Sequence, residues 1–345
     1  MKSSYNEQDV TMLIKDLTGI AKPVSLEERA KLVAEGAFER SIMIKEYPIS
    51  KEYQDVVWDS MEKYGSQTAI AVMSLGTQLY KAKGKDLVLV SIIRAGIPIG
   101  ILLKKWIKFR FGVDVPHYAI SLVKGLDDNA MKYILCHHRN AEGIQFIDGW
   151  TGKGTVAKEL IESAENYEGV DASLAVLSDA IGISKYCGIR RDFAVPSAPL
   201  NATATGLVSI TVFGNDMVGD DDFHGAMYLE DLEPMDKSVD FINHIEDRFK
   251  ELSKIFKFED VDFEPAVLVD EITPVAEALG KDKKLLNPGI NEAARAILRR
   301  DLEALLVSNK DDFDVQCISR LAEMKGVPVK EYPLRHYKAV SVAKN

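Results

Sequence analysis

Two mainly apolar runs, residues 87–93 and 144–147, stand out in the hydrophobic pattern of this chain. Such short runs are typical of strands that a parallel sheet buries on both faces. A glycine-containing loop and a helical sequence follow each run, the helices being expected at residues 100–109 and 156–163. The repetition predicts an α/β fold, with a parallel sheet flanked by helices over residues 86–213.

The remaining pattern predicts four segments. Residues 1–48 are expected to form a helical extension, and residues 49–225 the main α/β domain. Residues 226–264 form an acidic helical connector, and residues 265–345 a small C-terminal α/β module with strands at 305–307, 327–329 and 339–342 and a helix at 315–324. Residues 267–269 are expected to lead into this module as a strand or helix. The connector carries an apolar stripe at helical spacing: Val239, Ile242, Ile245, Phe249, Leu252 and Phe256.

Charge supports this division. The chain has a net charge of −10, yet residues 281–345 contain 13 Lys and Arg against 9 Asp and Glu. Residues 216–264 contain 16 acidic against 5 basic residues, so we expect a solvated surface there. For part of this excess of negative charge, an acidic metal-binding loop at Asp220, Asp221 and Asp222 is the alternative interpretation.

The loop after the second strand has the composition of an anion site. Asp148 ends the strand, and a turn rich in Gly and Thr leads into the next helix. Backbone N–H groups at a helix N-terminus attract phosphate, and a carboxylate can hold a hydroxyl group or a magnesium-bound water. A nucleotide-binding P-loop is excluded, because Gly154 stands where Ser or Thr should follow the lysine. An ordinary Gly-rich strand-to-helix turn is the alternative. The expected phosphate-binding residues are Thr151, Gly152, Lys153, Gly154 and Thr155.

The loop after the first strand offers a second set of donors. It contains Arg94, Ala95 and Gly96, in which a guanidinium suited to phosphate adjoins flexible backbone. An Arg paired with a carboxylate at the sheet edge is the other interpretation. Residues 117–125 predict a further strand that ends in Lys124. Ligands of open α/β sheets bind at the carboxyl ends of the strands, so these loops are expected to share one cleft.

Together these loops resemble those of type I phosphoribosyltransferases. The resemblance implies a phosphoribosyl pyrophosphate (PRPP) ligand whose 5′-phosphate lies in the turn at 151–155. It also implies catalytic roles for Asp148 on the ribose hydroxyls and for Arg94 and Lys124 on the departing pyrophosphate. Magnesium would be bound through the diphosphate, with no dedicated protein metal site. The chain departs from the family pattern in having one acidic residue, followed by Gly149, where two are usual.

A closer resemblance covers nearly the whole chain. It is to the phosphoribosyltransferase-like family of bacterial tellurite- and stress-response (Ter) operons, some of whose members are named cysteine protease StiP. The resemblance leaves three functions open: a transferase in nucleoside-type biosynthesis, a cysteine protease, and a catalytically silent nucleotide- or RNA-binding regulator. The protease would need Cys136 or Cys187 as nucleophile and His117, His137 or His138 as base.

The C-terminal module has a signature of its own. The sequence Gly289-Ile-Asn-Glu292 followed by Arg295 resembles the motif of Pelota-like RNA-binding domains. That resemblance implies contacts of Gly289, Asn291, Glu292 and Arg295 with unpaired bases of a structured RNA. Capping of a helix by an Asn–Glu pair is the simpler alternative.

The sequence also bears on location and assembly. No apolar stretch approaches the roughly 18–20 residues of a membrane span, and no signal peptide is recognisable at the N-terminus. Three widely spaced cysteines favour a reducing compartment over a disulfide framework. We therefore expect a cytoplasmic protein without membrane contact, and a homodimer is left open.

Overall fold

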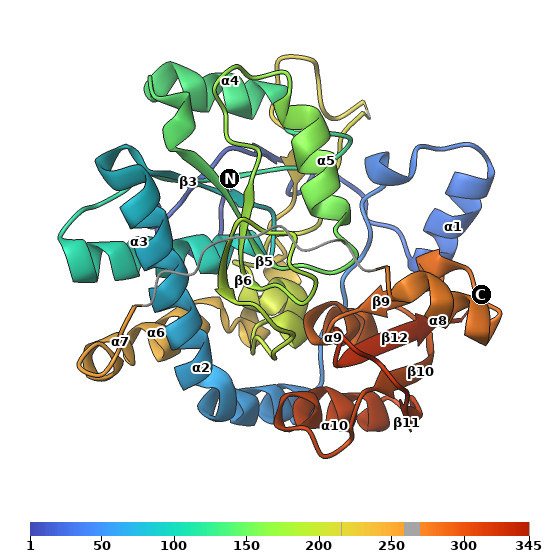
Figure 1. Cartoon of the computed structure of the whole chain (residues 1–345). Coiled ribbons are helices and arrows are strands. Elements are labelled where there is room, and N and C mark those ends of the chain that lie inside the picture. Colours follow the sequence, from blue (N-terminus) through green and yellow to red (C-terminus); the bar gives the residue numbers. More distant parts are fainter. Residues whose placement is uncertain (215, 259–269, 345) are drawn as a thin grey trace.

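A six-stranded parallel sheet organises the computed structural model, which describes residues 1–214, 216–258 and 270–344. The strand order is β1-β4-β3-β5-β6-β7, and each neighbouring pair is parallel (Figure 1). The strands are β1 (Thr11–Met12), β3 (Val88–Ile92), β4 (His117–Ile120), β5 (Ile144–Trp150), β6 (Leu174–Ser178) and β7 (Tyr186–Ile189). The prediction of a parallel sheet flanked by helices is confirmed.

Helices cover both faces of the sheet. α2 (Lys51–Lys83) and α3 (Gly96–Phe111) lie on one face, and α4 (Asp128–His137) and α5 (Thr155–Ala164) lie on the other. Side chains of β3 alternate between the two sides: Leu89 belongs to the core under α2 and α3, whereas Val88 and Val90 belong to the core under α4 and α5. This double burial explains why the strand sequences are nearly continuous apolar runs.

α2 and α3 pack at close range around one tryptophan. Trp106 is fully buried, and its indole N–H donates to Thr77 Oγ1 at 3.1 Å. A Cβ on Gly76 would come within 2.7 Å of the Trp106 ring, so the glycine lets the two helices approach. Within the described residues, none of the helices combines the length and the apolarity that crossing a membrane requires.

The N-terminal segment contains less helix than its sequence suggests. Residues 1–48 contain α1 (Leu26–Ala34) and the short 3-10 helix η1 (Glu39–Ser41). They also supply β1 to the main sheet, and β2 (Lys15–Asp16) pairs with β8 (Gly225–Ala226). These residues are therefore part of the main domain rather than a separate extension.

One face of the connector packs on the main domain, while most of its described acidic side chains are exposed, as the sequence predicts. Its apolar stripe divides between α6 (Ser238–Glu246) and α7 (Phe249–Leu252), and Ile242, Ile245 and Phe249 are buried. Phe249 meets Trp106 edge to face, with ring centroids 5.4 Å apart. Residues 259–264 of the predicted connector, and the expected lead-in at 267–269, lie outside the described residues. The short 3-10 helices of the main part are η2 (Gly84–Asp86), η3 (Ala141–Gly143), η4 (Ala198–Ala204) and η5 (Glu230–Met235).

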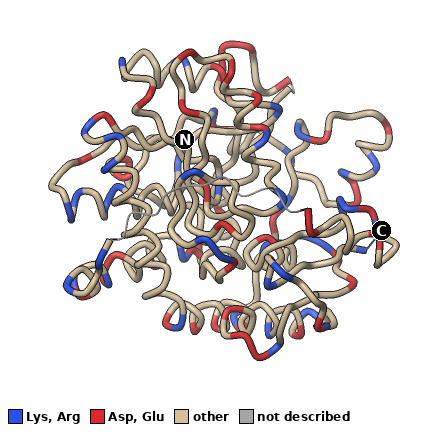
Figure 2. The backbone as a smooth tube through the Cα atoms, viewed as in Figure 1, with Lys and Arg blue, Asp and Glu red and all other residues tan. Residues whose placement is uncertain are grey.

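The C-terminal module is a four-stranded sheet with helices. The strand order is β11-β10-β12-β9, with strands β9 (Leu286–Pro288), β10 (Leu302–Val307), β11 (Val329–Glu331) and β12 (Ala339–Ala343). The helices are α8 (Ile272–Leu279), η6 (Lys283–Leu285), α9 (Ile290–Arg299), η7 (Phe313–Val315) and α10 (Gln316–Met324). In Figure 2 basic and acidic residues occur in both parts of the chain.

One hydrophobic core joins the module to the main domain. It contains Leu75 and Ile147 from the main domain together with Ile290, Leu305 and Leu321 from the module. We call the contact surface around the start of α9 the seam; it comprises residues 192–195, the turn at 151–155 and α9.

Polar bonds fix the register of the seam. Asn291 is 2% exposed; its side-chain oxygen accepts from the Val195 N–H at 2.8 Å, and its NH₂ donates to the Phe193 carbonyl at 3.0 Å. The buried Asp192 carboxylate accepts from the backbone N–H groups of Ile290 and Lys338. Because buried polar groups need partners, these bonds specify one docking position.

Asn291→Ala should therefore destabilise the whole protein. The substitution leaves the Val195 N–H and the Phe193 carbonyl buried without a partner, at a cost of about 2–4 kcal/mol in the free energy of unfolding. Urea denaturation measures this change, and Asn166→Ala on the exposed end of α5 is the control, expected to stay within about 0.5 kcal/mol of wild type. Equal stabilities of the two variants would show that the bonds do not hold the seam together.

Candidate functional site

A cleft lies at the carboxyl ends of β3 and β5, where the module closes over the main sheet. Its volume is about 390 Å³. The main domain contributes Arg94, Asp148, Trp150 and the turn at 151–155, and the module contributes Glu292, Arg295 and Arg300. The loops that carry Arg94 and Asp148 therefore share a cleft, and residues of the predicted RNA motif complete its wall.

Asp148 lies deep in this cleft. Its Oδ1 accepts from the Gly149 N–H at 2.7 Å. Burial raises the pKa of the Asp148 carboxyl to about 7, and only part of this effect is offset by the Gly149 bond and by Arg295. A carboxyl that changes protonation near neutral pH can exchange a proton with a ligand.

Glu292, Arg295 and Trp150 form a bonded group opposite Asp148. Glu292 Oε1 accepts from the Trp150 indole N–H at 2.8 Å and from Arg295 Nη1 at 2.9 Å. The Arg295 guanidinium lies 5.8 Å from the centre of the Trp150 ring. Burial alone would raise the pKa of Glu292, but Arg295 and the Trp150 bond outweigh it and hold that pKa below its ordinary value. Trp150 thus binds the module rather than being free in the cleft.

The turn at 151–155 is largely occupied by bonds within the protein. The Thr151 hydroxyl donates to Asp179 Oδ1 at 2.8 Å, and the Lys153 ammonium donates to the Lys283 carbonyl at 2.8 Å. The Gly152 carbonyl accepts from the Tyr337 hydroxyl at 2.9 Å. A Cβ on Gly152 would lie 3.0 Å from Glu292 Cγ, so this glycine permits close docking of the module.

The end of the turn is more open. Gly154 has φ 80° and precedes α5 without a side-chain cap, and Thr155 is exposed. The phosphate-binding roles of these five turn residues stay predictions. Among the described residues, Gly154 and Thr155 are the two turn residues that no side-chain hydrogen bond engages.

Arg94 is paired away from Asp148. Its guanidinium binds both carboxylate oxygens of Glu46, at 2.5 and 3.0 Å, and donates to the Val208 carbonyl at 2.9 Å. The ion pair is buried, with side chains 3% and 12% exposed. The alternative of an Arg paired to a carboxylate at the sheet edge therefore describes this residue better than a pyrophosphate ligand.

The neighbours of Arg94 pack the loop. Ala95 precedes α3, and a Cβ on Gly96 would lie 2.3 Å from the Ile147 carbonyl, so Gly96 permits the contact of α3 with β5. Lys124 has φ 60°, and its ammonium lies over the Phe38 ring, 4.9 Å from the centre. Lys124 does not line the cleft.

The three cysteines have different environments. Cys136 is exposed in the last turn of α4, whereas Cys187 in β7 is buried and Cys317 in α10 is half-buried. Burial raises the pKa of the Cys187 thiol to about 12 and that of the Cys317 thiol to about 11. Both thiols are therefore protonated, and weakly nucleophilic, near neutral pH.

The candidate histidine bases bond to groups other than cysteine. His117 is buried between Ser91 Oγ and the Asp9 carbonyl, both at 2.8 Å, and burial lowers its pKa to about 3. His137 Nδ1 lies 2.8 Å from the Tyr133 carbonyl, and His138 Nε2 lies 2.9 Å from the Tyr118 hydroxyl. His117 is thus a neutral core residue, while His137 and His138 lie at the surface end of α4 next to Cys136.

The structure contains site residues that the sequence did not indicate to us. Asp179 accepts from Thr151 and from the backbone N–H groups of Gly182 and Ser184. It directly follows the apolar strand β6, as Asp148 closes the apolar part of β5, and this pattern could have identified it. Glu46 and Asp192 lie in irregular segments, and no sequence pattern distinguishes them.

No metal site emerges from the described part of the chain, where no group of three His, Cys, Asp or Glu side chains is placed to hold an ion. In the acidic loop, Asp222 pairs with Lys15 at 2.5 Å and accepts from the Gly219 N–H. The family resemblance implies magnesium that is bound through a diphosphate ligand rather than through protein side chains, so magnesium binding stays a prediction.

Fold and cleft together define a two-part α/β protein whose C-terminal module closes over the main sheet. Residues 3–246 match the family described as tellurite-like stress resistance cysteine protease StiP, and residues 269–345 match the PELOTA RNA binding domain. A relative from Acinetobacter baylyi, named cysteine protease StiP, is 30% identical over 346 residues, covering 95% of this chain and 89% of the relative. The chain belongs to the StiP family.

These matches overturn the transferase interpretation. The family and the relative are both described as cysteine proteases, so the predicted phosphoribosyltransferase function and enzyme class are wrong, and a PRPP partner is unsupported. The predicted pyrophosphate ligand Arg94 is held by Glu46, which agrees with this correction.

Asp148 should make stability depend on pH. Its pKa is about 7 in the folded protein against an ordinary 3.8, so the folded state retains a proton that the unfolded chain releases between these values. Stability therefore falls as pH rises through this window. Asp148→Asn stays neutral, and its melting temperature relative to wild type should rise from pH 5 to pH 8. The exposed Asp311→Asn is the control; a pH-independent difference for Asp148→Asn would contradict the shift.

Proposed function

We propose that the protein is a cysteine-dependent peptidase and that Cys136 is its nucleophile. Family membership supports the reaction class. The exposure of Cys136 carries the choice of residue, because a peptide in solution can reach this thiol, while Cys187 and Cys317 are enclosed and have raised pKa values.

The surroundings of Cys136 supply two imidazoles. Tyr133 accepts from His137 Nδ1 and stacks on its ring, with centroids 4.1 Å apart, which leaves Nε2 as the basic nitrogen. His138 follows the helix in an extended conformation, and its pKa is lowered by desolvation and by His137, so it is neutral near pH 7. Side chains of successive helical residues point about 100° apart, so an adjacent imidazole does not face the Cys136 thiol. The end of α4 must therefore change conformation to bring an imidazole to the thiol.

The reaction follows from these groups. A neutral imidazole takes the thiol proton, and the sulfur attacks the peptide carbonyl carbon to form a thioester. The imidazolium returns the proton to the leaving amine, and water then hydrolyses the thioester. The acidic limb of the pH profile should lie below about 6.5, the ordinary pKa of histidine, if His138 is the base.

Cys136→Ala should abolish peptide hydrolysis and labelling by a fluorescent iodoacetamide at neutral pH. Cys317→Ala, which removes a half-buried thiol with a raised pKa, should retain both and is the matched control. Hydrolysis of unfolded casein by the full chain measures the activity. Undiminished hydrolysis by Cys136→Ala, or hydrolysis lost only in Cys317→Ala, would reject the assignment.

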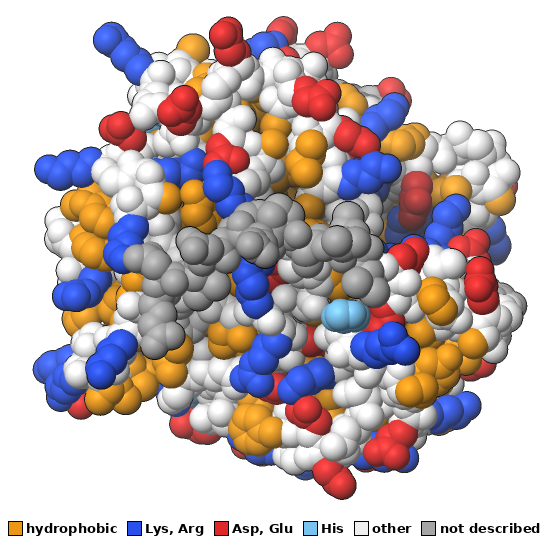
Figure 3. All heavy atoms as spheres, in the orientation of Figure 1, with side chains coloured by type: hydrophobic (Ala, Val, Ile, Leu, Met, Phe, Trp, Pro, Cys, Tyr) orange, Lys and Arg blue, Asp and Glu red, His pale blue; other side chains and the backbone are white. Residues whose placement is uncertain are grey.

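The PELOTA match favours a second function, the binding of structured RNA. Asn291 is enclosed in the seam and cannot reach a base, but Glu292 and Arg295 face the cleft beside Trp150. On the face shown in Figure 3, outside the part drawn in grey, Lys and Arg side chains stand among hydrophobic, acidic and other side chains. An unstacked base entering the cleft therefore fits better than a long phosphate contact.

Arg295→Ala in the full chain should remove a preference for kinked over fully paired RNA. Lys310→Ala, at an exposed position of the module, should lower affinity for both RNAs alike. Gel-shift titrations of the wild type and both variants with the two RNAs, at two salt concentrations, measure these affinities. Equal, weak binding of both RNAs by the wild type would mean that the module serves only as a structural part.

A further inference from the structure

A second cavity lies between α1 and α9, on the other side of the Glu292–Arg295 pair. Its volume is about 420 Å³, within the range of small-molecule sites. Leu26 and Ile44 from the N-terminal segment form its apolar wall. Five basic side chains and two acidic ones also line it: Arg29, Arg295, Arg299, Arg300, Lys344, Glu292 and Asp301. A chain with a net charge of −10 thus gathers an excess of positive charge here.

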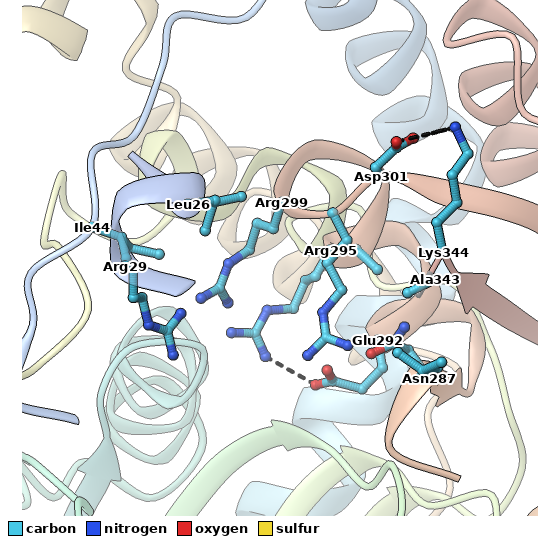
Figure 4. A pocket seen from close by; sticks show the side chains of 13 residues that line it. Leu26, Arg29, Ile44, Asn287, Glu292, Arg295, Arg299, Asp301, Ala343 and Lys344 are labelled. Carbon is cyan, nitrogen blue, oxygen red and sulfur yellow. Dashed lines mark hydrogen bonds and ion pairs between the residues drawn. The ribbon is translucent and has the colours of Figure 1, made fainter. Parts of the chain in front are cut away.

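Three guanidinium groups face the cavity from two sides. Figure 4 shows Arg29 reaching in from α1, and Arg295 and Arg299 from α9. Arg295 and Arg299 are four residues apart and so lie on one helix face, where like charges repel by about 0.2–0.5 kcal/mol. Arg29 pairs with Glu39 and Arg295 with Glu292, so each of these two cations has a carboxylate.

Arg299 differs from its neighbours. Among the described residues, no hydrogen bond or ion pair engages its guanidinium, although the side chain is partly buried between two cavities. Desolvation, together with Arg295 and Arg94, lowers the pKa of Arg299 to about 9. An enclosed cation without a partner is costly, so a structure that keeps one needs an anion to offset the cost.

We propose that this cavity binds a small phosphate-bearing polyanion, clamped by Arg299 and Arg295 on α9 and by Arg29 on α1. Guanidinium groups match phosphate oxygens with paired donors. Asn287 also lines the cavity, and its side-chain NH₂ donates to Ser341 Oγ at 3.1 Å. The enclosure by α1, α9 and the end of β12 suits a small molecule better than a nucleic-acid strand. α4, which carries Cys136, lies well apart from α9 in Figure 1, so this site is independent of the proposed peptidase.

Calorimetric titration of the full chain with inorganic tripolyphosphate tests the site, with inorganic phosphate as the weaker probe. Wild type should bind tripolyphosphate, and Arg299→Gln should lose at least tenfold in affinity. Arg335→Gln is the matched control, because Arg335 is exposed in the same module and does not line the cavity. It should remain within twofold of wild type. Unchanged binding by Arg299→Gln, or an equal loss in Arg335→Gln, would overturn the proposal.

Thermal melting, without and with the anion, gives a second test of the site. Without an anion, Arg299→Gln should melt at the same or a higher temperature than wild type, since an enclosed unpaired charge is removed. With tripolyphosphate, wild type should gain melting temperature and the variant should not. Arg29→Gln on the other wall should likewise weaken the gain. A wild type that tripolyphosphate leaves unchanged, or a stronger Arg299-dependent response to a short RNA, would contradict a small-molecule site.

Discussion

The docking of α9 against the main domain is the interaction on which both cavities depend. Asn291 and Asp192 fix the start of the helix by bonds to backbone groups, so the register of α9 cannot slip. The same helix presents Glu292 and, one turn further along, Arg295 to the cleft, and Arg299 another turn on to the second cavity. A rigid helix with buried polar bonds at one end thus sets the geometry of charged groups on two sides.

The main sheet was predictable because strands that are buried on both faces have nearly continuous apolar sequences. β3 and β5 were visible as apolar runs followed by loops and helices. In the module β10 and β12 were predicted, β11 overlaps the expected strand only at Val329, and β9 was not predicted. The N-terminal strands β1 and β2 were not visible, because each has two residues and depends on a partner far along the chain. The connector was predictable for the same reason, because its apolar stripe marks the face that packs on Trp106 and its acidic residues mark the exposed face.

The structure bears on where the predicted site residues lie, while their roles stay predictions. The loops carrying Arg94 and Asp148 do converge, since the carboxyl ends of parallel strands must meet at one edge. Which side chains remain available to a ligand depends on long-range partners such as Glu46 and Asp179, and sequence pattern cannot supply these. The same holds for Asn291: a residue type suited to reading bases is equally suited to satisfying buried backbone groups.

The shared core also constrains how the chain folds during synthesis. The Tyr64 hydroxyl of α2 donates to the Phe313 carbonyl at 2.7 Å, and α10 covers the apolar face around it. A ribosome must add some 250 residues after Tyr64 before this partner emerges, so one flank of α2 stays uncovered for most of translation. Proteins built in this way are exposed to premature association of nascent chains. A chaperone that shields α2 until the last strands arrive would therefore raise the yield of folded protein more than one acting on the finished chain.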